Sequence, residues 1–267
     1  MTGPGAADSQ SLVIHRDAGV LAQAAAARLI VKLIDVQSAR ELAHVSLTGG
    51  TVGIGTLAAV AGLPARDAVD WNRVHLWWSD ERFLPTGDPE RNDTQARAAL
   101  LDRLDIPAAQ VHTMPATDGP DGLDAQSAAD RYAADLAGFA DPAVPGSDAP
   151  SFDVLLLGMG PDGHIASLFP GHPGAYEEKP SVIAVHNSPK PPPDRLSMTF
   201  RVIEAAREVW VVAAGAEKAA AVKMALSGAG RIQVPAAGAH GRARTLWLVD
   251  RAAAAQLPPG LNRIASP

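Results

Sequence analysis

An aspartate and a histidine lie two residues apart in the sequence Gly160-Pro161-Asp162-Gly163-His164. Imidazole side chains titrate near neutral pH, so His164 is a candidate general base. Asp162 is placed to orient that imidazole or to bind a hydroxyl group of a substrate. Gly160 and Gly163 let the backbone turn sharply and approach a ligand closely. The pattern favours a site of proton transfer, but a surface glycine turn with an exposed Asp and His has the same sequence.

A second candidate site is Thr48-Gly49-Gly50-Thr51, which joins an apolar segment to a helical pattern. The backbone N–H groups of such a glycine turn, together with the positive end of the helix dipole, bind phosphate. The motif lacks the lysine of a P-loop and the spacing of a dinucleotide-binding loop. A plain turn with a threonine cap is therefore the alternative.

Three charged residues, Asp80, Glu81 and Arg82, directly follow the apolar segment Val74–Trp78. Charges placed just beyond a buried strand are typical of ligand-binding loops. Surface ion pairing is the alternative explanation of this cluster.

Two later segments carry further cations. Lys218 is expected in the first turn of a helix, where a cation opposes the helix dipole unless it shares an anion. A simple exposed lysine is the alternative there. The run from Ser188 to Arg195 contains four prolines, so it is expected to be an extended loop that presents Lys190 or Arg195.

The hydrophobic pattern indicates which elements position these residues. Short apolar segments typical of strands occupy 11–15, 44–47, 74–78, 154–157, 182–185, 208–213 and 245–249. Helical spacing covers 17–40, 54–61, 94–104 with Asn92 or Asp93 as its cap, 125–137, a segment after Gly215 that ends near 225, and 252–255.

This alternation predicts an α/β fold: a single-domain doubly wound, mostly parallel sheet with helices on both faces. The carboxyl ends of parallel strands lie at one edge of such a sheet, so the polar clusters are expected to converge there. We expect one domain over residues 1–267, with residues 1–10 as a flexible N-terminus.

The composition excludes several classes of protein. With 267 residues, of which 47% are hydrophobic and 19% charged, the chain is globular. A formal net charge of -6 argues against nucleic acid as a partner. The absence of cysteine excludes disulfides, thiolate zinc sites and a cysteine nucleophile, and no cluster of metal ligands is evident. No signal peptide and no apolar run of about 20 residues is found, so we expect a cytoplasmic location and no membrane partner.

The segments described above form an ordered set of motifs: Thr48–Thr51, Ser79–Pro85 with Arg91-Asn92, Gly158–Pro170, Arg195–Thr199 and Glu217-Lys218-Ala219. This set spans nearly the whole chain and resembles that of the 6-phosphogluconolactonase family, which is related to glucosamine-6-phosphate deaminases. The deaminases share the Asp-Gly-His core but continue with Asn-Glu-Pro, where this chain has Ser167-Leu168-Phe169-Pro170.

Two positions depart from the pattern of the family. Thr48 stands where relatives usually carry serine, and Val52-Gly53 stands where many carry Thr-Pro or Asn-Pro. Both positions belong to the expected phosphate loop, whose two glycines are kept.

The resemblance implies hydrolysis of 6-phospho-D-glucono-1,5-lactone to 6-phospho-D-gluconate, the second step of the oxidative pentose phosphate pathway, without a metal or organic cofactor. A water activated by His164 would attack the lactone carbonyl, and Arg82 or backbone N–H groups would stabilise the oxyanion. The implied catalytic residues are His164, Asp162 and Arg82. The implied substrate-binding residues are Thr48, Gly49, Gly50, Thr51, Asp80, Glu81, Gly160, Gly163, Arg195 and Lys218.

Two other functions are compatible with the same motifs. A glucosamine-6-phosphate deaminase-like sugar-phosphate isomerase would use the same scaffold. A non-catalytic sugar-phosphate-binding regulator would keep the phosphate-binding residues, although His164 counts against it. The expected partner is a small-molecule phosphorylated sugar lactone, and the expected assembly is a monomer or a small homo-oligomer.

Overall fold

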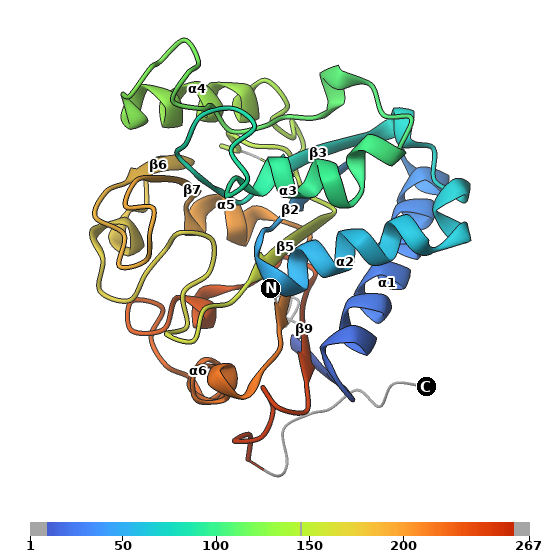
Figure 1. Cartoon of the computed structure of the whole chain (residues 1–267), viewed down its shortest axis with the longest axis vertical. Coiled ribbons are helices and arrows are strands. Elements are labelled where there is room, and N and C mark those ends of the chain that lie inside the picture. The colour runs from blue at the N-terminus through green and yellow to red at the C-terminus, as the bar shows by residue number, and fades with distance from the viewer. Residues whose placement is uncertain (1–9, 145, 259–267) are drawn as a thin grey trace, which may run out of the picture.

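The computed structural model describes residues 10–144 and 146–258. Its main sheet contains six parallel strands in the order β1-β9-β8-β5-β2-β3 (Figure 1). They are β1 (Gln10–His15), β2 (Ala43–Leu47), β3 (Val74–Trp78), β5 (Val154–Gly158), β8 (Glu208–Ala213) and β9 (Arg244–Asp250). The prediction of a doubly wound, mostly parallel α/β fold is confirmed.

Helices cover both faces of the main sheet because successive side chains of its strands point to opposite faces. In β5, Val154 and Leu156 belong to one apolar cluster, and Leu155 and Leu157 belong to the other. Helices α1 (Ala18–Ala39), α2 (Gly50–Gly62) and α3 (Asn92–Ala99) complete the first cluster. Helices α4 (Ala125–Ala137), α5 (Phe200–Ala205) and α6 (Ala219–Leu226) complete the second. Strands buried on both faces explain the unbroken apolar run in β5.

Aspartate side chains cap the N-termini of two of these helices. Asp17 accepts a hydrogen bond from the N–H of Val20 at 2.8 Å and starts α1 immediately after β1. Asp124 accepts from the N–H groups of Gln126 and Ser127 and starts α4. Such caps stabilise a helix, since they satisfy N–H groups that have no partner within it.

A second sheet, antiparallel and three-stranded, packs beside the first and was not predicted. Its order is β4 (Asp80–Arg82), β7 (Arg195–Met198) and β6 (Val182–Val185). We expected residues 182–185 to form a strand, but the hydrophobic pattern assigned them to the main sheet. The N–H of Met198 donates to the carbonyl of Ser79 at 2.8 Å. The end of β7 is therefore hydrogen-bonded to the residue that directly follows β3.

The register of the small sheet places Arg82 directly opposite Arg195. Like charges opposite each other in a sheet are unfavourable unless something of opposite charge lies between or beside them. The pairing therefore brings two arginines, far apart in sequence, to one position at the edge of the main sheet.

Three smaller predictions need correction. The helix expected over residues 94–104 is α3, which ends at Ala99, and its N-cap is Arg91 instead of Asn92 or Asp93. The helix expected over residues 252–255 is a series of turns. Gln10 belongs to β1, and the remainder of the expected flexible N-terminus, residues 1–9, lies outside the described residues.

Within residues 10–144 and 146–258, no helix is both long and apolar enough to cross a membrane. The same described part of the chain holds no group of three or more His, Asp or Glu side chains arranged to bind a metal ion.

Candidate active site

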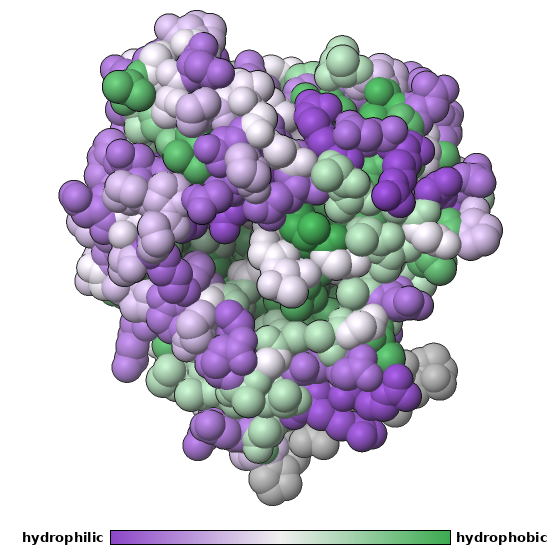
Figure 2. Space-filling view, in the orientation of Figure 1, coloured by the Kyte–Doolittle hydropathy of each residue, from purple (hydrophilic) through white to green (hydrophobic). Residues whose placement is uncertain are grey.

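A pocket of about 540 Å³ opens where the chain diverges at the carboxyl end of the main sheet. After β2 the chain continues to β3 on one side, whereas β5 is followed by β8 on the other side. Loops that leave two neighbouring strands in opposite directions leave a crevice between them, which is where ligands bind in open α/β sheets. The centre of this face of the molecule is visibly hollowed (Figure 2).

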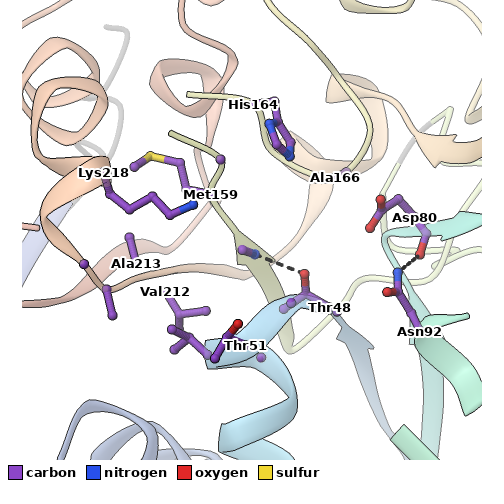
Figure 3. A pocket seen from close by; sticks show the side chains of 18 of the residues that line it. Thr48, Thr51, Asp80, Asn92, Met159, His164, Ala166, Val212, Ala213 and Lys218 are labelled. Atoms are coloured by element: carbon purple, nitrogen blue, oxygen red, sulfur yellow. Dashed lines mark hydrogen bonds between the residues drawn. The ribbon is translucent and has the colours of Figure 1, made fainter. Parts of the chain in front are cut away.

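Ten of the thirteen residues predicted for the site line this pocket. They are Thr48, Gly49, Gly50, Thr51, Asp80, Arg82, Gly160, His164, Arg195 and Lys218. The side chain of Lys218 enters from one side of the pocket, Asp80 and Asn92 lie on the other side, and His164 lies across from Thr48 (Figure 3). The convergence expected from the sequence is therefore observed for most of the set.

Asp162 lies behind His164 and contacts it directly. Its Oδ1 atom is 2.6 Å from Nδ1 of His164. Burial alone would raise the pKa of the Asp162 carboxyl, but the hydrogen bond from His164 and the charges of His164 and Lys190 outweigh burial and lower that pKa. An ionised carboxylate only accepts hydrogen bonds, so Nδ1 carries the proton and Nε2 carries the lone pair of the neutral ring. The arrangement suits a general base.

Glycine is required at two positions of the turn that holds this pair. A Cβ atom at Gly160 would collide with the imidazole of His164 and the carboxylate of Asp162. Gly163 has a φ of +83°, and a Cβ atom there would lie 2.7 Å from a methyl group of Val234. The predicted glycine turn thus allows the His–Asp contact to form.

The loop after β2 presents its backbone to the pocket. Gly50 has a φ of +76° and begins α2, so the first N–H groups of that helix face the ligand-binding edge. A Cβ atom at Gly49 would collide with the side chain of Asn92. The hydroxyl of Thr48 accepts a hydrogen bond from the N–H of Gly158 at 3.0 Å and so ties the ends of β2 and β5 together.

Two of the three residues that depart from the family pattern in this loop, Thr48 and Gly53, lie against each other. A Cβ atom at Gly53 would lie 2.6 Å from the carbonyl oxygen of Thr48 and 2.8 Å from its methyl group. The extra methyl group that threonine has over serine therefore fills space left free by Gly53.

This contact predicts opposite effects for two glycines of the same helix. Gly53→Ala should lower the free energy of unfolding by about 1–3 kcal/mol, because the new methyl group overpacks against Thr48. Gly55→Ala is the matched control, since its Cβ atom would meet only Ala22 at an ordinary 3.7 Å. It should raise stability by about 0.5–1 kcal/mol through higher helix propensity. Denaturant unfolding of both variants tests this, and equal stabilisation by both would contradict the proposed contact.

Arg82 is held at the pocket wall by a chain of hydrogen bonds through Asn92. Nη1 of Arg82 donates to Oδ1 of Asn92 at 3.1 Å, and Nδ2 of Asn92 donates to the carbonyl of Asp80 at 2.9 Å. The carboxylate of Asp80 in turn accepts from the hydroxyl of Ser167 at 2.7 Å. The sequence predicted Asn92 only as a possible helix cap, whereas the structure places its side chain between Arg82 and Asp80.

Glu81 lies beneath the pocket and outside its lining. The side chain is fully buried, and its two carboxylate oxygens accept hydrogen bonds from the backbone N–H groups of Arg82, Asn92 and Asp93. Arg91, also buried, approaches the same carboxylate at 3.9 Å. These contacts give Glu81 the geometry of a support for the loop that carries Arg82 and Asn92, instead of direct access to a ligand.

The other basic side chains of the pocket are partly withdrawn from water. Burial lowers the pKa of Lys218, and the nearby charge of Lys190 lowers it further. No carboxylate among residues 10–144 and 146–258 lies within ion-pair distance of Lys218. Burial also lowers the pKa of Arg195, whose guanidinium packs 5.7 Å from the ring centre of Phe169. Together with Arg82 these groups give the pocket the positive character that an anion requires.

The residues that follow His164 pack into the hydrophobic core and add no carboxylic acid to the pocket. Leu168 and Phe169 are buried, and the ring of Phe169 packs 4.6 Å from that of His164. Ser167 is also buried, with its hydroxyl on Asp80. The carboxylate that the deaminase sequence Asn-Glu-Pro would place here is therefore absent from this position.

His44 and His75 lie far from this edge, at the amino ends of β2 and β3. Their rings stack with centroids 4.9 Å apart, and Nδ1 of His75 is 2.9 Å from Nε2 of His112. Burial lowers the pKa of His44 to about 3, and that of His112 to about 4, so both are neutral at pH 7. The cluster packs against Trp77 and has the contacts of a structural group.

Comparison with known proteins identifies the family of this chain. The family model described as glucosamine-6-phosphate isomerases/6-phosphogluconolactonase matches residues 16–247. The chain belongs to this family. A curated 6-phosphogluconolactonase from Streptomyces coelicolor is 61% identical over 261 residues, which cover 97% of this chain and 99% of that protein. One from Mycobacterium tuberculosis is 48% identical over 250 residues, covering 94% and 99%.

Solved structures of the glucosamine-6-phosphate isomerase/6-phosphogluconolactonase family have the same fold. The 6-phosphogluconolactonase from Trypanosoma brucei superposes with a TM-score of 0.78 at 28% identity, covering 94% of this chain and all of that chain. A monomeric glucosamine-6-phosphate deaminase superposes with a TM-score of 0.74 at 20% identity. The second likeness shows only the fold, so the reaction must be argued from the site and from the closer relatives.

One side chain that contacts the His–Asp pair was not among the predicted site residues. Lys190 lines the pocket, and its Nζ atom lies 3.5 Å from Oδ1 of Asp162. The proline-rich run indicated a loop that presents either Lys190 or Arg195, but no local signal shows where such a loop folds.

Proposed function

We infer that this chain hydrolyses 6-phospho-D-glucono-1,5-lactone to 6-phospho-D-gluconate, the second step of the oxidative pentose phosphate pathway. The observation that carries this inference is the 2.6 Å contact between Asp162 and His164 inside a pocket lined by four basic side chains. Ester hydrolysis needs a base to activate water, and His164 can be that base. The basic side chains of the pocket can bind the negative charge of a phosphorylated substrate. Relatives that are 48–61% identical over nearly the full chain are named as 6-phosphogluconolactonases.

The reaction uses His164 first as a base and then as an acid. Nε2 takes a proton from water as the water oxygen attacks the lactone carbonyl carbon, and the carbonyl oxygen becomes an oxyanion. When the tetrahedral intermediate collapses, the bond to the ring oxygen breaks and Nε2 returns its proton to that oxygen. The products are the ring-opened hydroxyl and the carboxylic acid, which then ionises. Asp162 fixes the tautomer and stabilises the imidazolium that forms between the two steps.

Two groups of residues are proposed to bind the substrate. Arg82, Arg195 and Lys218, with the N–H groups of Gly50 and Thr51, supply positive charge and donors for the phosphate and the oxyanion. Thr48, Gly49 and Gly160 shape the backbone around the substrate, whereas Gly163 lies outside the pocket lining and only shapes the turn that carries His164. Asp80 lies in the pocket wall, where it can accept a hydrogen bond from a sugar hydroxyl. Glu81 holds the loop beneath them.

The activity is tested with freshly generated phosphorylated lactone. The wild-type protein should accelerate formation of 6-phosphogluconate above the spontaneous rate, and it should release no ammonia from glucosamine 6-phosphate. Ammonia release without lactone hydrolysis would indicate the deaminase reaction instead. Tight binding of the phosphorylated sugar with no turnover of either compound would indicate a regulator and would contradict our proposal.

Three further properties stay proposals. We propose that residues 1–267 form one domain, since the family match runs from residue 16 to 247 and both sheets contribute to one pocket. A cytoplasmic location fits the pathway proposed above. A monomer or small homo-oligomer is the expected assembly, which sedimentation analysis will determine.

A further inference from the structure

The proline-rich loop places the ammonium group of Lys190 beside the His164–Asp162 pair. Nζ of Lys190 lies 3.3 Å from Nδ1 of His164 and 3.5 Å from Oδ1 of Asp162. An ammonium group only donates hydrogen bonds, and Nδ1 of His164 already donates to Asp162. Lys190 and His164 therefore share one carboxylate oxygen, and the ammonium charge lies beside the imidazole ring.

Arg195 holds the backbone of the loop that carries Lys190. Nη2 of Arg195 donates to the carbonyl oxygens of Lys190 and Pro191 at 3.2 and 2.9 Å, and Nε donates to that of Pro192 at 3.3 Å. Prolines have no N–H group, so this loop cannot satisfy its own carbonyl groups through regular structure. The planar fork of a buried arginine supplies donors to three of these carbonyl groups, and the hydroxyl of Ser188 also donates to that of Lys190 at 2.9 Å. Arg195 is thus committed in large part to the loop.

The charges around the imidazole act in opposite directions. Asp162 favours a positive ring, whereas Lys190 disfavours it, because a second positive charge would form 3.3 Å from an ammonium group. The pocket lining carries further charged side chains: Glu217 and Lys218 in the turn just before α6, Asp250 at the end of β9, and Asp80, Arg82 and Arg195 from the small sheet. The ring of Phe169, which packs 4.6 Å from the imidazole, is apolar.

We propose that Lys190 is a positioning residue that keeps His164 neutral, with its lone pair on Nε2, and that Arg195 holds the loop where Lys190 can do so. The proposal rests on the lactonase function inferred above. It separates two effects on the base: Asp162 fixes the tautomer and supports the imidazolium formed during the reaction, whereas Lys190 prevents the ring from being protonated before water is bound.

The test is the pH profile of kcat/KM for the phosphorylated lactone, measured by pH-stat between pH 5 and 8 with the spontaneous rate subtracted. Lys190→Met should move the acidic limb to higher pH by roughly one unit, the size expected for a partly solvated charge about 3–4 Å away. Lys190→Arg keeps the charge and should keep the limb close to its wild-type position. Lys179→Met, at an exposed lysine outside the pocket lining, is the matched control and should leave the profile unchanged.

Arg195 provides an independent arm of the test. Arg195→Met should shift the limb in the same direction as Lys190→Met, and the double variant should shift it no further than the larger single change. Additive shifts would show that Arg195 acts on the base by another route and would overturn its assigned role. Circular dichroism and thermal unfolding of each variant identify any loss of folding.

Two other outcomes are decisive. If Lys190→Met raises KM for the phosphorylated lactone while the limb stays in place, Lys190 binds phosphate and the proposal is wrong. If the wild-type protein itself shows no lactone hydrolysis, the proposed function fails, and that result is distinct from an unmoved limb in an active enzyme.

Discussion

Replacing His164 with alanine should lower kcat for the phosphorylated lactone by roughly 10²–10⁴-fold and change KM little. The physical reason is that the imidazole is needed only when water loses its proton, so its removal affects the transition state and not substrate binding. Steady-state kinetics with freshly generated lactone measures both constants. A variant that keeps nearly wild-type turnover would remove His164 from the mechanism and make Asp162 the leading candidate for the base.

The chain supplies a matched control for this substitution. His186 also pairs with an aspartate, its Nδ1 lying 2.7 Å from Oδ1 of Asp194, but 58% of its side chain is exposed and it lies outside the pocket lining. His186→Ala should therefore leave kcat and KM near their wild-type values. A comparable loss in both variants would indicate that the effect of His164→Ala is structural.

The second large effect is expected at Lys218, and it should depend on the phosphate group of the substrate. Lys218→Ala should reduce kcat/KM for the phosphorylated lactone about 10- to 100-fold, mainly through KM, because a charged hydrogen bond is worth about 1.5–3 kcal/mol. The slow hydrolysis of unphosphorylated glucono-δ-lactone should scarcely change, since that substrate has no phosphate to lose. Lys223→Ala, at an exposed position of the same helix, should affect neither substrate.

Arg82 should behave differently if it also faces the oxyanion. Its guanidinium is tied to the carbonyl of Glu90 at 2.5 Å and to Asn92 at 3.1 Å while it lines the pocket. Arg82→Ala is therefore expected to lower kcat/KM for both lactones, because the oxyanion forms in either reaction. An equal loss on both substrates for Lys218→Ala would rule out its role as a phosphate clamp and would assign it to the reacting carbonyl.

The sequence alone determined the strands of the main sheet and the Asp162–His164 turn because both depend on short-range patterns. Apolar runs of four to six residues indicated strands buried on two faces, and the predicted limits of β3, β8 and α4 agree with the structure. The Asp162-Gly163-His164 contact is equally local, since two residues and one glycine turn fix its geometry. The resemblance of the motifs to a known family then gave the reaction.

Only the tertiary structure decided which distant side chains meet in the pocket. Strand β4 consists of three charged residues and has no hydrophobic alternation, so nothing in its sequence predicts the pairing that sets Arg82 opposite Arg195. The site of Lys190 depends on where Arg195 holds a proline-rich loop. Glu81 was expected to bind substrate but lies beneath the pocket, bound to backbone N–H groups. Hydrophobic periodicity reports which residues are buried, whereas the partner of a charged side chain is chosen by long-range packing that no local pattern encodes.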